Sequence, residues 1–80
     1  MPLFYFDLHD GTNVVRDTQG FDLPDLSAAQ ARLVQIMRRM AQLLDAVNER
    51  QDYLAIVRDQ NGRVVLRATL TFELEDVGTV

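Results

Sequence analysis

The chain of 80 residues contains no cysteine, which excludes disulfide bonds and thiolate metal sites. A protein of this size buries only about 60 to 65% of the surface of its unfolded chain. A hydrophobic core or a partner must therefore supply the stability that small secreted domains take from disulfides. The absence of cysteine favours a reducing compartment, and we predict a cytoplasmic protein.

Long hydrophobic runs and targeting signals are also missing. No apolar stretch approaches the roughly 18 residues that a membrane span needs, and the opening MPLFYFDL lacks the basic segment of a signal peptide. Positive charge is scarce, since 8 basic side chains face 12 acidic ones and the net charge is -4. This charge repels phosphate backbones and anionic membrane surfaces. We therefore expect neither a membrane nor a nucleic acid as the partner.

Motifs of catalysis are absent too, because no serine or cysteine lies in a nucleophile elbow and the 4 glycines stand singly rather than in a phosphate-binding loop. The candidates for catalysis or metal binding are Asp7, His9 and Asp10, of which Asp7 and His9 share one strand face. Two ligands on one strand leave the coordination of a metal ion incomplete, and only Asp17 or Asp22 is near enough in sequence to add a third ligand. We predict a solvated strand face, with no catalytic residue, metal, cofactor, small-molecule substrate or enzymatic activity.

With 48% hydrophobic and 25% charged residues, the composition is that of an ordinary globular protein. We predict a single domain over residues 1–80, in which residues 75–80 form a frayed tail. Apolar and polar side chains alternate over residues 3–9, as in a half-buried strand. Asp10-Gly11 then favours a tight turn, and Val14-Val15 begin a returning strand.

Residues 14–20, VVRDTQG, are echoed by residues 56–62, IVRDQNG. Each segment predicts a strand followed by a turn. In these turns Asp17 or Asp59 is expected to bond the backbone two residues on, and Gly20 or Gly62 to take a left-handed conformation. Shared turn chemistry explains the echo more simply than gene duplication.

A helix is predicted after Pro24, where Asp25 or Ser27 can cap it and Ser27 forms a capping box with Gln30. Apolar residues then recur at spacings of three, four and seven, which predicts an amphipathic helix with one face to bury. About 23 residues, or roughly six turns, fit before Asn48. The stripe consists of Leu26, Ala29, Leu33, Ile36, Met37, Met40, Leu43, Leu44 and Val47.

A second hairpin is predicted after the helix, with strands over residues 53–58 and about 63–74 and a turn at Asn61-Gly62. The length of the turn decides which side chains of the first strand face inward, beside Leu66 and its neighbours. The inward set is Tyr53, Ala55 and Val57 after a two-residue turn, or Leu54 and Ile56 after a three-residue loop with a glycine bulge.

The predicted fold is α+β in the order β-β-α-β-β, with an antiparallel sheet of about four strands and one long amphipathic helix packed on one face. The helix leaves the other face of the sheet bare, and a sizeable apolar patch on a soluble protein usually marks an interface. We therefore predict a homodimer, or a complex with another protein, through this face. The possible interface residues are Tyr53, Leu54, Ile56, Val57 and Val65.

The segments MPLFYFDLHDG, GFDLPDL and RDQNGR resemble a family of short, mostly alphaproteobacterial proteins that share a domain of unknown function. Its members open with M-P-x-Y-[YF]-F-[HD]-[LV], start a helix with E/D-L-P-D-x-x-x-A and close with a D-x-x-G-R hairpin. The resemblance covers nearly the whole chain, although Leu3 and Phe4 stand where the family often has Tyr or Arg. Because its motifs are turns and helix caps, the resemblance implies a fold and no activity.

Residues 23–26, LPDL, are also similar to HicB-type antitoxins, in which a hairpin, a P-D-L segment and a helix follow one another. Those proteins usually have P-D-L-P-G and a third strand before the helix, and the sequence predicts neither here. We expect a small non-enzymatic binding or assembly module that acts through protein–protein contact. The alternative is an antitoxin-like or nucleic-acid-contacting regulatory protein with a basic surface of Arg32, Arg38 and Arg39.

Overall fold

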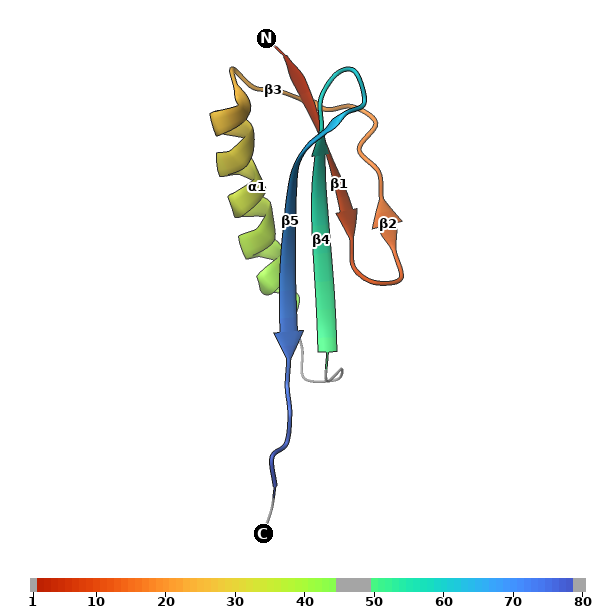
Figure 1. Ribbon diagram of the computed structural model, residues 1–80, viewed down its shortest axis with the longest axis vertical. Helices are drawn as coiled ribbons and strands as arrows, with labels where there is room; N and C mark the ends of the chain where they lie inside the picture. The colour runs from red at the N-terminus through yellow and green to blue at the C-terminus, as the bar shows by residue number, and fades with distance from the viewer. Residues whose placement is uncertain (1, 45–49, 79–80) are drawn as a thin grey trace.

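The computed structural model describes residues 2–44 and 50–78, which form one helix and an antiparallel sheet (Figure 1). This confirms the predicted α+β fold. The sheet has a short strand before the helix that the sequence did not predict, so three strands precede the helix. The elements are β1 (Leu3–His9), β2 (Val14–Val15), β3 (Phe21–Asp22), α1 (Leu26–Ala41), β4 (Arg50–Arg58) and β5 (Val64–Glu73).

The two edges of the sheet differ in length. The strand order is β2-β1-β4-β5, and β3 also pairs with β1. Strands β2 and β3 meet opposite ends of β1, with Leu8 opposite Val15 and Phe4 opposite Phe21. That edge therefore consists of two separate two-residue strands, β2 and β3, with a gap between them. The opposite edge is the ten-residue strand β5.

The register of β4 and β5 combines the two alternatives that the sequence left open. Val57 lies opposite Leu66 and Ala55 opposite Ala68, which is the register expected for a two-residue turn. The turn is nevertheless the longer loop, because the Asp59 N–H donates to the Arg63 carbonyl at 2.8 Å. A register shift at Val57/Arg58 leaves Val65 without a partner in the pairing. The longer loop alone would turn Leu54 and Ile56 toward the helix. The bulge moves the register by one residue, so Ala55 and Val57 face the helix instead.

The core lies between α1 and the strands, and α1 contacts both β4 and β5. Its residues come from the alternating positions of β1 and β4 and from the apolar stripe of α1. This follows from the two periodicities, since every second strand residue and every third or fourth helical residue share a face. The buried cluster consists of Phe4, Phe6, Ala29, Leu33, Ala55 and Val57.

Helix α1 begins as predicted and ends earlier than predicted. Asp25 is the N-cap, and its side chain accepts a hydrogen bond from the Ala28 N–H at 2.8 Å. The helix has 16 residues and stops at Ala41, where the N–H groups of residues 42–44 bond to carbonyls three residues back. Such bonds tighten the last turn and close the helix. Leu43 of the predicted stripe is 67% exposed, and Val47 and Asn48 lie outside the described residues.

The molecule is elongated. Its radius of gyration is 15.2 Å and its extents are 59 × 22 × 17 Å, whereas a compact domain of this length has a radius of gyration of about 12 Å. Figure 1 shows the reason, since β5 and the chain after it run past the end of α1. Residues 74–78 lie outside the sheet and have no regular structure. Among the described residues, no helix is long and apolar enough to cross a membrane.

Candidate functional site

Asp7, the first candidate ligand, is 6% exposed and is bound within the chain. Arg58, at the end of β4, donates from Nε to Oδ2 at 2.7 Å and from Nη2 to Oδ1 at 3.1 Å. The Asp17 N–H also donates to Oδ1, at 2.9 Å, and Arg58 Nη2 donates to the Asp17 carbonyl at 3.0 Å. The bidentate pair therefore ties β1 and β4 to the segment between β2 and β3.

The pKa values of both carboxyl groups in this cluster lie below the ordinary value. The hydrogen bond from Arg58 lowers the pKa of Asp7 by more than burial raises it. Burial raises the pKa of Asp17, but the N–H groups of Gly20, Phe6 and Gln19 together outweigh it. Both side chains are therefore held as anions at neutral pH, Asp7 by its ion pair with Arg58 and Asp17 by backbone N–H groups.

His9 and Asp10 do not join this cluster. His9 is half-buried at the end of β1, opposite Leu54, and borders a shallow hollow of about 280 Å³. Asp10 accepts a hydrogen bond from the Asn13 N–H at 2.7 Å, which closes the first turn and lowers the pKa of Asp10. Within the part of the chain that the structure describes, no three His, Asp or Glu side chains gather as a metal site requires. The absence of a functional metal stays a prediction.

The echoed segments have the turn chemistry that the sequence predicted. Asp17 Oδ1 accepts from the Gln19 N–H at 3.0 Å, and Asp59 Oδ1 accepts from the Asn61 N–H at 2.8 Å. Gly20 and Gly62 have φ values of +77° and +82°, which favour glycine. The sequence did not reveal the second role of Asp17, whose Oδ2 accepts the Phe6 N–H at 3.0 Å. One sequence feature could have indicated this role. The dipeptide Arg-Asp occurs in both echoed segments, and it supplies Asp17 in the first segment and Arg58 in the second.

The register divides the predicted interface residues between two faces. Leu54 and Ile56 lie on the face opposite α1 and are half-buried, whereas Tyr53 belongs to the helix side. Val57 has no exposed surface, and Val65 packs against the core. Val57 is therefore not available to a partner, because the register turns it under the helix.

The face opposite α1 is more polar than the sequence suggested. One end carries the Asp7–Arg58 pair described above. At the other end Asp52 accepts hydrogen bonds from Arg50 Nε at 3.0 Å and from Thr71 Oγ1 at 2.9 Å. These bonds hold the pKa of Asp52 below its usual range. The apolar part of this face is reduced to Leu54, Ile56 and their neighbours.

An apolar hollow lies instead between α1 and β5. It has a volume of about 440 Å³, and Val34 on its helix side is 46% exposed. We call it the α1–β5 groove. The sequence did not predict it because a helix about 10 Å wide cannot cover the full width of the sheet. Its apolar lining consists of Leu33, Val34, Met37, Ala41, Leu66, Ala68 and Leu70.

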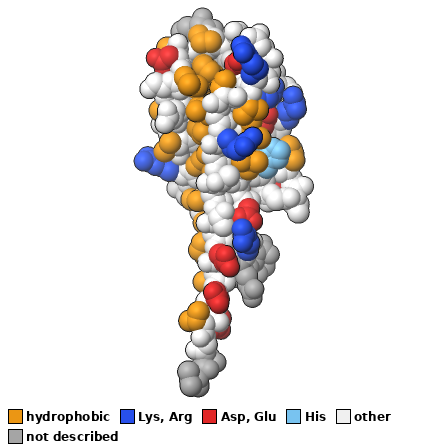
Figure 2. All heavy atoms as spheres, in the orientation of Figure 1, with side chains coloured by type: hydrophobic (Ala, Val, Ile, Leu, Met, Phe, Trp, Pro, Cys, Tyr) orange, Lys and Arg blue, Asp and Glu red, His pale blue; other side chains and the backbone are white. Residues whose placement is uncertain are grey.

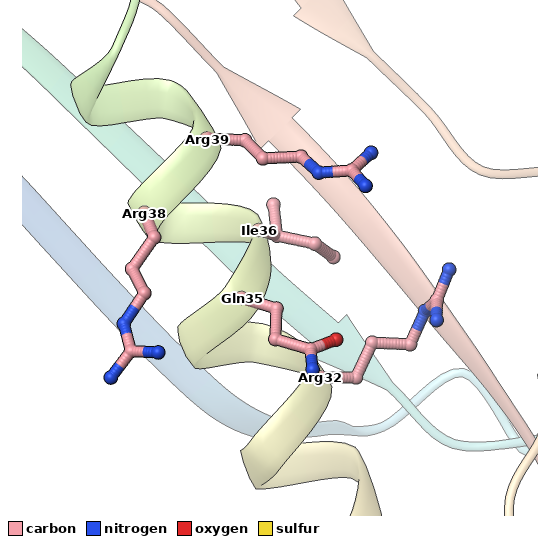
Figure 3. Close-up of a pocket in the computed structure, with 5 residues that line it drawn as sticks. All are labelled: Arg32, Gln35, Ile36, Arg38 and Arg39. Carbon is pink, nitrogen blue, oxygen red and sulfur yellow. The ribbon is translucent and has the colours of Figure 1, made fainter.

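The helix arginines border a second hollow, of about 340 Å³ (Figure 3). Figure 3 shows Arg32 and Arg39 extending to one side of α1 and Arg38 to the other. The Arg32 guanidinium lies 3.9 Å from the centroid of the Phe21 ring, so it stacks on β3. All three side chains border this hollow, but Arg38 extends away from the other two and Arg32 is engaged by the Phe21 ring.

Comparison with known proteins identifies a family without assigning an activity. Residues 3–71 match the family model of a domain of unknown function, DUF6894. The match spans β1 through most of β5. No curated protein and no solved structure shows a significant match.

Proposed function

Since the chain belongs to the DUF6894 family of domains of unknown function, we propose its function from its own surfaces: a small, cytoplasmic, non-enzymatic binding or assembly module that acts through protein–protein contact. The observation that carries this proposal is the α1–β5 groove, which lies beside the long edge strand β5. A partner that binds here can bury apolar side chains that α1 leaves exposed, which is favourable.

The size of the core supports the same role. A single chain of 80 residues is only modestly stable on its own. A partner that covers the groove adds apolar burial where α1 leaves the sheet open. We propose a second copy of the chain as this partner, so that the module is a homodimer.

Light scattering over a hundredfold range of protein concentration, centred on the micromolar range, tests this function. The homodimer has a mass near 18 kDa, which is twice the 9.1 kDa of the chain. A mass that stays at 9.1 kDa throughout this range contradicts the homodimer.

A matched pair of variants tests whether the groove makes the contact. Val34 lines the groove and is 46% exposed, whereas Val14 on β2 is 63% exposed at the other edge of the sheet. We expect Val34→Glu to shift the mass toward the monomer and Val14→Glu to leave it unchanged. Equal effects of the two substitutions would place the contact elsewhere.

A further inference from the structure

Strand β5 is the open edge of the sheet. It is ten residues long and has β4 as its only neighbour within the described part of the chain. Every second residue of an edge strand directs its N–H and C=O groups away from the sheet, which makes a template for another strand. Natural proteins protect such edges by shortening or interrupting them. The β2/β3 edge is protected in this way and the β5 edge is not.

The sequence of this edge is nearly self-complementary. LRATLTFEL, residues 66–74, has Leu70 at its centre, and all but one of the pairs of matching positions on the two sides consist of apolar or threonine residues. The only charged residues of the segment, Arg67 and Glu73, are equally far from the centre and have opposite signs. In an antiparallel pair of identical strands each residue therefore meets a residue of compatible chemistry.

We propose that a second copy of the chain adds to this edge by antiparallel pairing of β5 with β5, centred on Leu70. The inference rests on the proposed assembly function and specifies its surface and register. The two sheets then form one continuous sheet, with a twofold axis at Leu70. The opposed residues are Leu66 with Leu74, Arg67 with Glu73, Ala68 with Phe72 and Thr69 with Thr71.

The charges favour this direction of pairing. Arg67 is exposed and has no ion pair within residues 2–44 and 50–78, and Glu73 lies 3.6 Å from Arg50 of its own chain. Acidic side chains line the narrow lower part of the molecule, where β5 and the residues after it project (Figure 2). Antiparallel pairing brings this acidic end to the end that carries Arg63 and Arg67. Parallel pairing would place like charges together.

The shape of the α1–β5 groove fits the same register. Ala68 lines the groove, and the residue opposite it in the second copy is Phe72, on the same face of the sheet. The small side chain thus leaves room for the large one. Leu74 is 48% exposed and in the pair lies opposite Leu66, another residue of the groove. The second strand therefore covers the apolar surface that α1 leaves open.

The two helices do not obstruct the pairing. Helix α1 packs on β4 and β5, so the two helices of the pair lie on one face of the joined sheet. Because α1 lies over both strands, the two axes are about two strand spacings apart, or about 10 Å. Packed helices lie about 8 to 10 Å apart, so the two helices can pack against each other above the joined strands.

Two charge-reversed variants test the register. Arg67→Glu alone puts like charges at both symmetric positions of the dimer, and so does Glu73→Arg alone. A mixture of the two variants restores an attractive pair at both positions. We expect each single variant to weaken the dimer at least about tenfold, and the equimolar mixture to return to within about threefold of the wild type. Sedimentation equilibrium measures the dissociation constants of the wild type, the two variants and the mixture.

The matched control is Arg39→Glu, which changes the net charge by the same amount as Arg67→Glu but lies on the helix, directed away from β5 (Figure 3). It should dimerise like the wild type, and circular dichroism shows whether every variant is folded. A wild-type dimer with single variants that dimerise equally well, or a mixture that dimerises no better than the single variants, overturns the β5 pairing and leaves the assembly function standing. A wild type that stays monomeric overturns both.

Discussion

Arg58 connects three parts of the fold. Its guanidinium bonds the Asp7 carboxylate and the Asp17 carbonyl, so a single side chain joins β1, β4 and the segment that interrupts the sheet edge. Its side chain is 15% exposed and that of Asp7 is 9% exposed. Truncation of one partner of such a pair leaves the other charge buried and unpaired, which is costly.

We predict that Arg58→Ala lowers the free energy of unfolding by about 3 kcal/mol or more at pH 7. The control is Arg63→Ala, which removes the ion pair with Asp59 in the same hairpin. The Arg63 side chain is 77% exposed, so this loss should stay below about 1 kcal/mol. Denaturant titration measures both changes, and similar losses would contradict a structural role of the buried pair.

The same pair predicts a dependence on pH. Arg58 lowers the pKa of folded Asp7 below its value of 3.8 in an unperturbed carboxyl group. The stabilisation is therefore complete above the unfolded pKa and is lost as the pH falls through the folded pKa. We expect the stability difference between wild type and Arg58→Ala to be large at pH 7 and to shrink below about pH 4. A difference that is constant between pH 7 and pH 3 would contradict this assignment.

Alanine substitutions at Gly20 and Gly62 separate the cost of backbone strain from the cost of a side-chain clash. Both have positive φ, at +77° and +82°, but a Cβ on Gly20 would lie 3.0 Å from Cε1 of Tyr5, whereas nothing lies within 4 Å at Gly62. We predict that Gly62→Ala costs about 1 to 2 kcal/mol through backbone strain alone. Gly20→Ala should cost about 1 kcal/mol more, because Tyr5 must also move. Equal losses in thermal unfolding would show that the Tyr5 contact is unimportant.

At the scale of the elements, α1 stabilises the sheet through a narrow line of buried side chains. Leu33 is 5% exposed in the core, and Leu43, just after the helix, is 67% exposed. We predict a loss of about 2 to 5 kcal/mol for Leu33→Ala and less than about 0.5 kcal/mol for Leu43→Ala. Denaturant midpoints that change equally would mean that the stripe continues past Ala41.

The start of α1 could be predicted from the sequence and its end could not. Asp25 and the apolar spacing are local signals, and the structure uses both. The apolar spacing continues past residue 41, and no glycine or proline marks the end of the helix. The helix closes with hydrogen bonds from residues 42–44 to carbonyls three residues back, a feature that periodicity does not encode.

For the whole molecule, the sequence predicted the fold class and the turns but left the faces of the sheet open. Turn length alone allowed two registers, and the bulge at Val65 decided between them. A single unpaired residue has no distinctive sequence pattern. The Asp7–Arg58 pair could not be predicted from local patterns either, since it joins residues 51 positions apart. The α1–β5 groove follows from the width of a helix against a sheet, which periodicity does not describe.

Amide hydrogen exchange along β5 tests the proposed assembly most directly. In a monomer only every second N–H of an edge strand bonds to β4, so slow and fast exchange should alternate along the strand. In the proposed dimer both sets are bonded. We predict slow exchange at consecutive amides over residues 67–73 at high protein concentration, and alternation in the Arg67→Glu variant at the same concentration. Alternation in wild-type protein that is dimeric by mass would contradict pairing through β5.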